Sequence, residues 1–241
     1  MVACAHCNCF SSLGRPDCFN GKHRRSTFHL HPFLVLLAAM LTPYKALFRQ
    51  AVETAARPFV WLGLSPNGIT LLGLLLGLLT CLFFVWTRNA VVFGFLMIAW
   101  GLFDALDGAV ARLTNRVSKF GSYLDAMCDR MSECAAVLAA AYVSGYWILS
   151  FLLAVGVLLV SYAKARAAME VAVSNLEWPD FMERTERSII FTIGIILWGF
   201  FPGSFFGRDL FFWMLTGLNL AVYGTIVQRV LRAKRFIEAR P

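Results

Sequence analysis

Long apolar stretches alternate with short polar ones along most of the chain. Six predominantly apolar stretches occupy residues 68–86, 90–112, 121–141, 146–163, 188–206 and 210–227. Each approaches the roughly 20 residues that a helix needs to cross the hydrocarbon core of a bilayer. The pattern therefore predicts an all-α integral membrane protein with six transmembrane helices. In the first stretch, Gly73 and Gly77 form a G-x-x-x-G pair that favours close helix packing.

A mixed polar and apolar segment precedes the first of these stretches. Tyr44, Phe48 and Val52 recur at i,i+4 spacing, with Lys45 and Arg49 beside them. This spacing is typical of an amphipathic helix that lies on the membrane surface. The expected organisation is a surface helix at 40–66, a six-helix domain at 67–235 and a tail at 236–241.

The first 39 residues differ in character from the rest. Cys4 and Cys7 could begin a zinc or redox site, but no second Cys-x-x-Cys pair stands at a finger-like distance. Basic residues ahead of the apolar run 33–41 also give the segment a signal-like pattern. We expect residues 1–39 to be an extension, either disordered or upstream of a true translation start at Met40.

The distribution of charge predicts the topology. The chain is 59% hydrophobic with 22 Phe and a net charge of +8. A nucleic-acid-binding protein could share that charge, but here the basic residues border the apolar stretches and suit lipid headgroups, so no nucleic-acid partner is expected. With the N-terminus in the cytoplasm, 19 of the 22 Lys and Arg residues fall on the cytoplasmic side. We therefore predict a multi-pass protein of the cytoplasmic membrane.

Four carboxylates interrupt the apolar pattern. Asp104 and Asp107 are i,i+3 neighbours on one predicted helix, and Asp125 and Asp129 are i,i+4 neighbours on the next. If the two helices cross at this point, the four acids meet and repel one another unless cations bind them. Hard divalent ions with oxygen ligands, Mg²⁺ or Mn²⁺, fit such a site.

A purely structural role for these acids is the alternative. Arg112, Arg116 and Arg130 lie nearby and could pair with them. However, each ionised Asp in a membrane helix costs roughly 2.5–3.5 kcal/mol on insertion scales. The arginines also add charges that must themselves be accommodated. A functional role is therefore favoured, with the acids near the cytoplasmic ends of their helices and the active site facing the cytoplasm.

The acids belong to a longer pattern. It reads Asp104-x-x-Asp107-Gly108-x-x-Ala111-Arg112, eight further residues, then Gly121-x-x-x-Asp125-x-x-x-Asp129. This pattern resembles the signature of the CDP-alcohol phosphotransferase family at every specified position. The resemblance implies that an alcohol attacks a CDP-linked lipid and releases CMP. It also implies two bound divalent ions, Mg²⁺ or Mn²⁺, and a homodimer.

The resemblance also implies roles for individual residues. The metal ligands would be Asp104, Asp107, Asp125 and Asp129, and Asp129 would also be the general base. The nucleotide-binding residues would be Asn67, Thr70, Asp107, Gly108, Ala111, Arg112, Gly121 and Asp125. From the residues alone, Asn67 and Thr70 at a helix start could equally be N-capping residues.

Basic residues after the fourth and sixth stretches are candidates for binding the acceptor. They are Lys164, Arg166, Arg184, Arg187 and Arg229. Their arrangement is similar to that of family members that make phosphatidylinositol phosphate or its archaeal ether-lipid counterpart. The predicted reaction transfers a phosphatidyl-type group from CDP-diacylglycerol or CDP-archaeol to inositol 1-phosphate and releases CMP, with glycerol 3-phosphate or serine as alternative acceptors. The competing interpretation is that these residues only anchor the helix ends at the membrane surface.

Two functions from other classes remain to be weighed. A divalent-metal transporter could use the acids as its ion site, but such proteins often show inverted repeats or helices broken at mid-membrane. Neither pattern is visible in this sequence. A membrane scaffold without chemistry would give four costly acids no purpose. Release of CMP from a CDP-lipid, with a chelator as control, separates these three possibilities.

Overall fold

The structure is a computed structural model that describes residues 50–170 and 182–239. Its long helices, in chain order, are α2 (Pro66–Thr87), α3 (Ala90–Leu113), α4 (Lys119–Ser144), α5 (Trp147–Glu170), α6 (Arg184–Phe200) and α7 (Leu210–Ala239). Helical backbone at residues 50–61 precedes α2. A helix therefore lies at each of the six positions that the apolar stretches predict. Residues 1–49, including the Cys4–Cys7 pair and the first part of the expected surface helix, lie outside the described residues.

Short connections and local caps define most of these helices. Ser65 caps α2 by accepting a hydrogen bond from the Gly68 N–H, and Pro66 occupies the first turn, where a missing N–H is harmless. Ser118 caps α4 in the same way through the Gly121 N–H (2.9 Å). Only Arg88 and Asn89 separate α2 from α3. Such a short connection makes the two helices antiparallel neighbours.

Four helices are long and apolar enough to cross a membrane, namely α2, α3, α5 and α7. The other two differ for visible reasons. Helix α4 carries Asp125, Asp129, Arg130 and Glu133, and α6 has 17 residues, the first four of which include two arginines and a glutamate. Charge within the middle of α4 and the short length of α6 thus set these two helices apart from the other four.

The structure corrects the end of the fifth predicted stretch. Helix α6 ends at Phe200 rather than at Phe206. Pro202 has no backbone N–H and disfavours helical backbone in the residue before it, and Phe201 has φ −122° and ψ 76°. Beyond it, β1 (Ser204–Phe205) and β2 (Arg208–Asp209) form a small antiparallel hairpin, the one departure from helix among the described elements.

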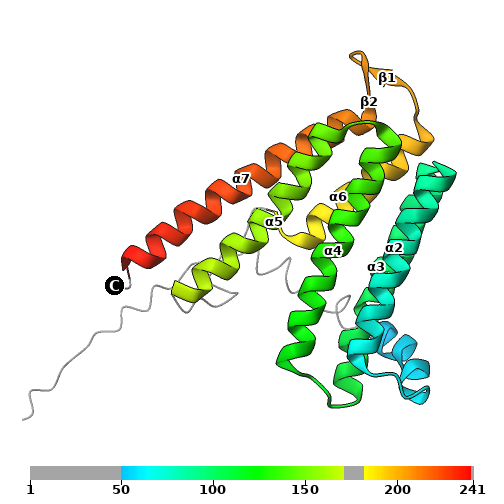
Figure 1. Cartoon of the computed structure of the whole chain (residues 1–241), viewed down its shortest axis with the longest axis vertical. Helices are drawn as coiled ribbons and strands as arrows, with labels where there is room; N and C mark the ends of the chain where they lie inside the picture. The colour runs from blue at the N-terminus through cyan, green and yellow to red at the C-terminus, as the bar shows by residue number, and fades with distance from the viewer. Residues whose placement is uncertain (1–49, 171–181, 240–241) are drawn as a thin grey trace, which may run out of the picture. The chain divides into compact units, whose positions relative to one another are not determined.

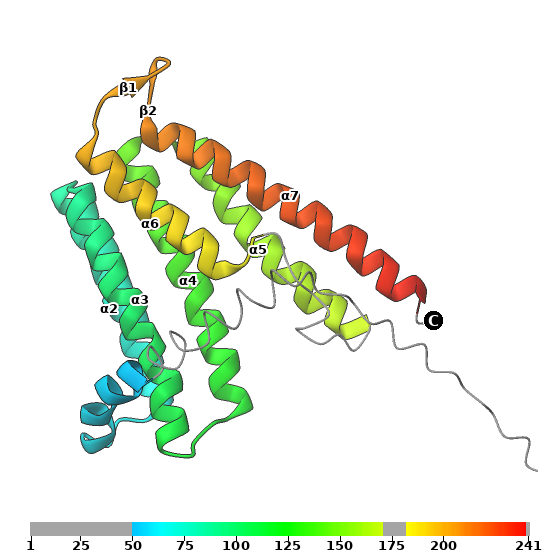
Figure 2. The ribbon, with the colours of Figure 1, turned by 180° about the vertical axis from the view of Figure 1, so that it is seen from behind.

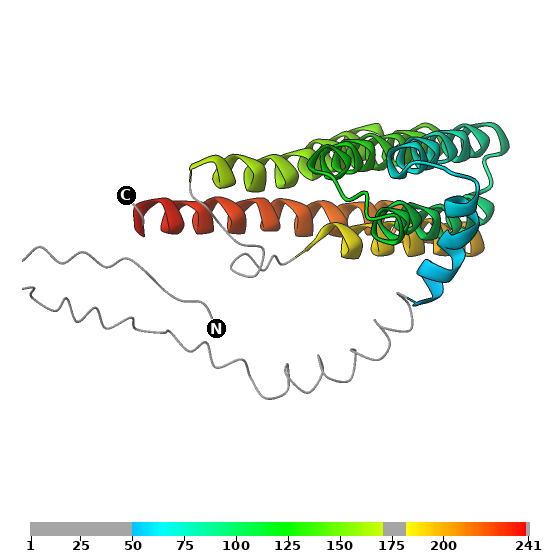
Figure 3. The ribbon, with the colours of Figure 1, turned by 90° about the horizontal axis from the view of Figure 1, so that it is seen from below.

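The helices pack in pairs around an apolar core. Helix α2 lies against α3 and α4, α5 lies beside α7, and α6 lies against α3 and α7 (Figures 1 and 2). The pairing of α5 with α7 is also visible from below in Figure 3. This arrangement leaves α4 linked mainly to α2 and α5. It places the start of α6 beside the middle of α3 and α4, where Asp104 and Asp129 lie (Figures 1 and 2).

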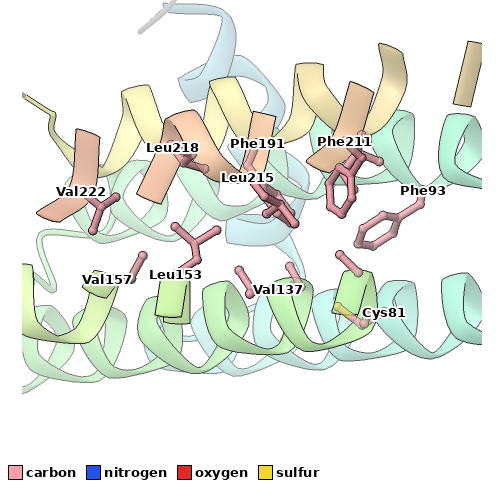
Figure 4. Packing of buried hydrophobic residues seen from close by; sticks show 14 of the residues in the cluster. Cys81, Phe93, Val137, Leu153, Val157, Phe191, Phe211, Leu215, Leu218 and Val222 are labelled. Atoms are coloured by element: carbon pink, nitrogen blue, oxygen red, sulfur yellow. The ribbon is translucent and has the colours of Figure 1, made fainter. Parts of the chain in front are cut away.

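The core between α5 and α7 follows simple helical periodicity. Leu215, Leu218 and Val222 of α7 are almost fully buried and face Leu153 and Val157 of α5 (Figure 4). Close approach is possible because α5 carries Gly156, where an added Cβ would lie 2.7 Å from Val222 Cγ1. Dispersion between closely packed side chains is the main attraction available to helices in lipid.

The glycine pair of α2 has a comparable packing role. A Cβ added at Gly77 would lie 2.7 Å from the indole of Trp100 on α3, and that indole N–H donates to the Gly73 carbonyl (3.0 Å). A second small cluster joins the helical backbone at 50–61 to the same pair of helices. There, Val52 and Ala56 are buried with Ile69, Leu106, Ala109 and Val110.

Candidate active site

Three of the four predicted acids meet at one point. Asp104 of α3 and Asp125 and Asp129 of α4 each offer a carboxylate oxygen, and these oxygens lie within 4.8 Å of one another. Asp104 and Asp125 are half-buried, whereas Asp129 is buried. Oxygen donors of this kind at this spacing suit a hard divalent cation. The donor set therefore fits the predicted metal site.

Asp107 lies beside this cluster but points to different partners. Its Oδ2 accepts a hydrogen bond from Thr70 Oγ1 of α2 (2.6 Å), and its Oδ1 accepts one from the Gly108 N–H. Asp107 still interacts electrostatically with Asp104 and Asp125. The structure thus separates three converging acids from a fourth that joins α2 to α3.

The predicted nucleotide-binding residues lie at one end of three neighbouring helices. Asn67 and Thr70 are in the first turns of α2, and the Asp107-to-Arg112 segment is in the last turns of α3. Gly121 begins α4, and a Cβ added there would lie 3.1 Å from Asn67 Oδ1. The residue that caps α2 is Ser65, so Asn67 and Thr70 are not the N-cap of this helix.

Within this group, Gly108 and Ala111 are half-buried and Arg112 is exposed. A Cβ added at Gly108 would lie 3.4 Å from Arg112 Nη1, so these two residues are neighbours. The Arg112 guanidinium also lies 3.9 Å from Glu53, which belongs to the helical segment ahead of α2. That segment therefore contacts the edge of the predicted nucleotide site.

Helix α6 brings a guanidinium to the acid cluster. Arg184 is its first residue, and it forms ion pairs with Asp104 Oδ2 (3.4 Å) and with Asp129 Oδ2. Glu186 stabilises this end of the helix, because its carboxylate accepts a hydrogen bond from the Glu183 N–H (2.9 Å). The Glu-Arg-x-Glu-Arg motif thus combines a helix cap with an arginine aimed at the acids.

The second arginine of that motif has a different partner. Arg187 is 3% exposed and pairs with Glu133 of α4 through Nε (3.3 Å) and Nη2 (3.2 Å). Glu133 also pairs with Arg130 on its own helix (3.0 Å). Sequence analysis did not single out Glu133. The signal was present, because residues 125, 129 and 133 are all acidic at i,i+4 spacing and share one helix face.

The remaining predicted acceptor residues are more dispersed. Arg229 of α7 is buried, donates a hydrogen bond to the Val160 carbonyl of α5 and interacts electrostatically with Arg187. Lys164 of α5 is half-buried, and the exposed Arg166 pairs with Glu170 one turn later on its own helix (2.6 Å). The segment 171–181, between these residues and α6, lies outside the described residues.

An apolar cavity adjoins the charged groups. Its volume is about 620 Å³, and α3, α4 and α6 provide most of its walls. Asp104, Asp129, Glu133, Arg184 and Arg187 line it together with apolar residues such as Met97, Leu102 and Ile193. Charged side chains and a large apolar surface therefore share one space. Such a site suits a molecule with a charged headgroup and a hydrocarbon tail.

The fold and the site define a class of protein: a helical membrane protein in which a cluster of acids lines a largely apolar cavity. The comparison with family models identifies it more closely. Residues 63–227 match the model of the CDP-alcohol phosphatidyltransferase family. The chain belongs to this family, as its sequence signature predicts, and it is an enzyme of the CDP-alcohol phosphotransferase class.

Two relatives show which members of the family this chain is similar to. The archaetidylinositol phosphate synthase of Pyrococcus horikoshii is 33% identical over 204 residues, which is 83% of this chain and 99% of that protein. The phosphatidylinositol phosphate synthase of Corynebacterium glutamicum is 30% identical over 190 residues, covering 76% and 83%.

Crystal structures of the phosphatidylinositol phosphate synthase of Mycobacterium tuberculosis resemble this fold. With CDP-DAG bound, that enzyme has a TM-score of 0.67 and 27% identity, over 76% of this chain and 94% of the other. A second structure of it, in complex with manganese and citrate, has the same TM-score and 28% identity, over 76% and 88%.

Proposed function

We propose that this enzyme transfers a phosphatidyl-type group from CDP-diacylglycerol or CDP-archaeol to inositol 1-phosphate and releases CMP. The observation that carries the proposal is the meeting of Asp104, Asp129 and Arg184 in the wall of a largely apolar cavity. Acids that bind divalent cations suit a pyrophosphate, and the apolar walls suit the lipid chains. An arginine at the same point suits a second, anionic substrate.

The metal ligands are proposed to be Asp104, Asp107, Asp125 and Asp129. Two bound Mg²⁺ or Mn²⁺ ions would neutralise the pyrophosphate and stabilise CMP as the leaving group. Asp107 would contribute through a further lone pair of Oδ1, which also accepts from the Gly108 N–H, or after a small rotation of its side chain. Thr70 and Asp107 together hold the start of α2 against the end of α3, where the cytidine nucleotide is proposed to bind.

The nucleotide site would use the remaining signature residues. Asn67, Gly108, Ala111, Arg112 and Gly121 lie at one end of α2, α3 and α4. Gly121 allows close approach, because any side chain there would crowd Asn67. Arg112, which is exposed, would be available to a phosphate of the nucleotide.

In the proposed reaction, an acceptor hydroxyl oxygen attacks the lipid-linked phosphorus of the CDP-lipid. The bond from that phosphorus to the bridging oxygen breaks, and CMP leaves with the bonding electrons. Asp129 takes the proton from the attacking hydroxyl. Arg184 would hold the phosphate of the acceptor, and because it also contacts Asp129, it would bring the hydroxyl group close to its base.

The acceptor phosphate would be bound by Arg184 together with Lys164 and Arg229. Arg229 interacts electrostatically with Arg187, which lies one turn from Arg184, so it belongs to the same basic region. Arg187 and Arg166 are weaker candidates, since each is paired with a glutamate. The fork geometry of a guanidinium suits the oxygens of a phosphate.

We also propose that all six helices cross the cytoplasmic membrane, with the segment before α2 on the membrane surface. Charged residues of α4 and α6 would then face the interior of the bundle or the headgroup region rather than lipid chains. The Lys and Arg bias places the acid cluster at the cytoplasmic side. Two copies of the chain would form a homodimer.

The test is a transfer assay on purified protein in lipid nanodiscs. Radiolabelled CDP-diacylglycerol or CDP-archaeol is supplied with inositol 1-phosphate, inositol, glycerol 3-phosphate or serine, and with Mg²⁺ or Mn²⁺. We expect CMP release to be fastest with inositol 1-phosphate and to stop when EDTA is added. Faster transfer to glycerol 3-phosphate or serine would assign that compound, instead of inositol 1-phosphate, as the acceptor. The absence of CMP release with every acceptor would contradict the reaction.

A matched pair of variants tests the acceptor site. Arg184→Ala should raise the KM for inositol 1-phosphate by about 10-fold or more, since a charge-assisted phosphate contact is lost. Arg208→Ala removes an exposed guanidinium from the hairpin between α6 and α7 and should leave this KM unchanged. Equal effects of the two variants would contradict the assignment of Arg184.

A further inference from the structure

Two ion pairs connect α4 to α6, one turn apart on each helix. The first joins Asp129 to Arg184, and the second joins Glu133 to Arg187. The backbones of α4 and α6 do not pack closely in the described part of the chain, because α6 lies against α3 and α7. The cavity lies between them, and all four of these side chains line it. The ion pairs therefore link α4 to α6 across the cavity, where the two helix backbones are not in close contact.

The two pairs differ in the burial of their arginines. The Arg187 side chain is 4% exposed and that of Arg184 is 38% exposed, whereas both acids are largely buried, at 14% for Glu133 and 8% for Asp129. Both Nε and Nη2 of Arg187 are within hydrogen-bonding distance of Glu133. Loss of the Glu133 carboxylate would remove the ion-pair partner of the buried Arg187 guanidinium, so this pair favours one arrangement of the two helices.

The position of Arg184 depends on this arrangement. Arg184 and Arg187 are three residues apart in the first turn and a half of α6, so a constraint on one limits the other. Arg187 is thus the buried charged residue at the start of α6, and Arg184 is the more exposed residue that contacts the acid cluster.

We infer that Glu133 and Arg187 are positioning residues: their buried ion pair fixes the start of α6 against α4 and thereby holds the Arg184 guanidinium at Asp104 and Asp129. The inference rests on the proposed function in one respect, namely that Arg184 binds the acceptor phosphate. It assigns Arg187 to helix placement rather than to direct contact with the acceptor. It also gives a role to Glu133, which lies outside the family signature found in the sequence.

Glu133→Gln distinguishes this role from direct binding of the acceptor by Arg187. If Arg187 bound the phosphate itself, removing its competing carboxylate would lower the KM for inositol 1-phosphate or leave it unchanged. Positioning predicts the opposite: the KM for inositol 1-phosphate rises by about 10-fold or more, since small misplacements of a binding group are costly. The KM for the CDP-lipid should stay within about twofold of wild type.

A matched pair of arginine-to-lysine variants provides the control. Arg187→Lys and Arg130→Lys each keep a positive charge beside Glu133 but remove the guanidinium fork. Arg187 joins two helices, whereas Arg130 and Glu133 are on the same helix. Arg187→Lys should therefore raise the KM for inositol 1-phosphate, and Arg130→Lys should not. Equal KM values for the two variants would overturn the inference.

Hydrogen exchange gives a readout that does not depend on activity. In wild-type protein in nanodiscs, the amides of residues 187–190, the first in α6 with backbone acceptors one turn earlier, are expected to exchange slowly. In Glu133→Gln and Arg187→Lys, these amides should exchange faster, while those of the α5–α7 core stay protected. If wild-type protein transfers nothing to any acceptor, the proposed function fails, yet this measurement still tests the positioning pair. Unchanged exchange in both variants would overturn it, and Arg187→Lys alone suffices if Glu133→Gln does not fold.

Discussion

The acid cluster and the contact between α5 and α7 are held by opposite kinds of interaction. In the α5–α7 contact, buried apolar residues such as Leu215 and Leu153 interdigitate and each one stabilises the fold. In the cluster, Asp104, Asp125 and Asp129 converge although their charges repel. The first region is explained by packing together with hydrogen bonds such as the one from Asn219 of α7 to the Leu149 carbonyl of α5 (3.0 Å). The second makes physical sense only when its cost to folding is set against a chemical task.

The comparison predicts opposite outcomes for mutations in the two regions. The largest effect on activity is expected from Asp125→Asn, which keeps the shape of the side chain and removes its charge. CMP release should fall by about 1,000-fold or more, because the metal and the charge it compensates are lost together. Stability in detergent should be unchanged or higher, since one repelling charge has gone. A variant with near-normal turnover would remove Asp125 from the metal site.

Leu215→Ala should have the converse effect. Leu215 is fully buried in the α5–α7 core, so truncation leaves a cavity. Leu→Ala in water-soluble cores costs about 2–5 kcal/mol, and in lipid we expect the lower part of that range because only the packing term remains. Thermal unfolding in nanodiscs measures the loss. Activity per folded molecule should be preserved. A loss of turnover without a loss of stability would contradict the purely structural role of the α5–α7 core.

The smallest effect is expected where neither region is touched. Lys234 of α7 pairs with Glu238 one turn later at 3.8 Å, and both side chains are about two-thirds exposed. Exposed pairs of this kind contribute about 0.3–0.5 kcal/mol. Lys234→Ala should therefore change neither CMP release nor the unfolding temperature measurably. A clear loss of activity would indicate that the acceptor region extends along α7.

The local sequence pattern predicted those features of the fold and the site that depend on residues close together in the chain. The helix positions, the glycine packing of α2 against α3 and the convergence of Asp104, Asp125 and Asp129 all follow from spacing along one or two helices. The early end of α6 could also have been predicted, because Pro202 and Gly203 lie two and three residues after Phe200, its last residue.

Contacts between segments that are far apart in the sequence could not be predicted from this local pattern. Arg184 reaches Asp104 across 80 residues of sequence, and no periodicity links the two. Asp107 was expected to be equivalent to the other acids, yet Thr70 of α2 takes one of its oxygens. Arg187 and Glu133 form a buried pair that depends on how α6 is placed beside α3 and α7. Such partners are chosen by tertiary packing rather than by local sequence.

The most direct test of the central claim is the binding of Mn²⁺ to purified protein, followed by electron paramagnetic resonance. The account predicts that wild-type protein binds the ion and that Asp104→Asn, Asp125→Asn and Asp129→Asn each weaken binding by about 10-fold or more, since a charged oxygen ligand is lost. Asp209→Asn, a matched change in the hairpin between α6 and α7, should bind as wild type does. Equal Mn²⁺ affinity in all five proteins would contradict the assignment of the acid cluster as a metal site.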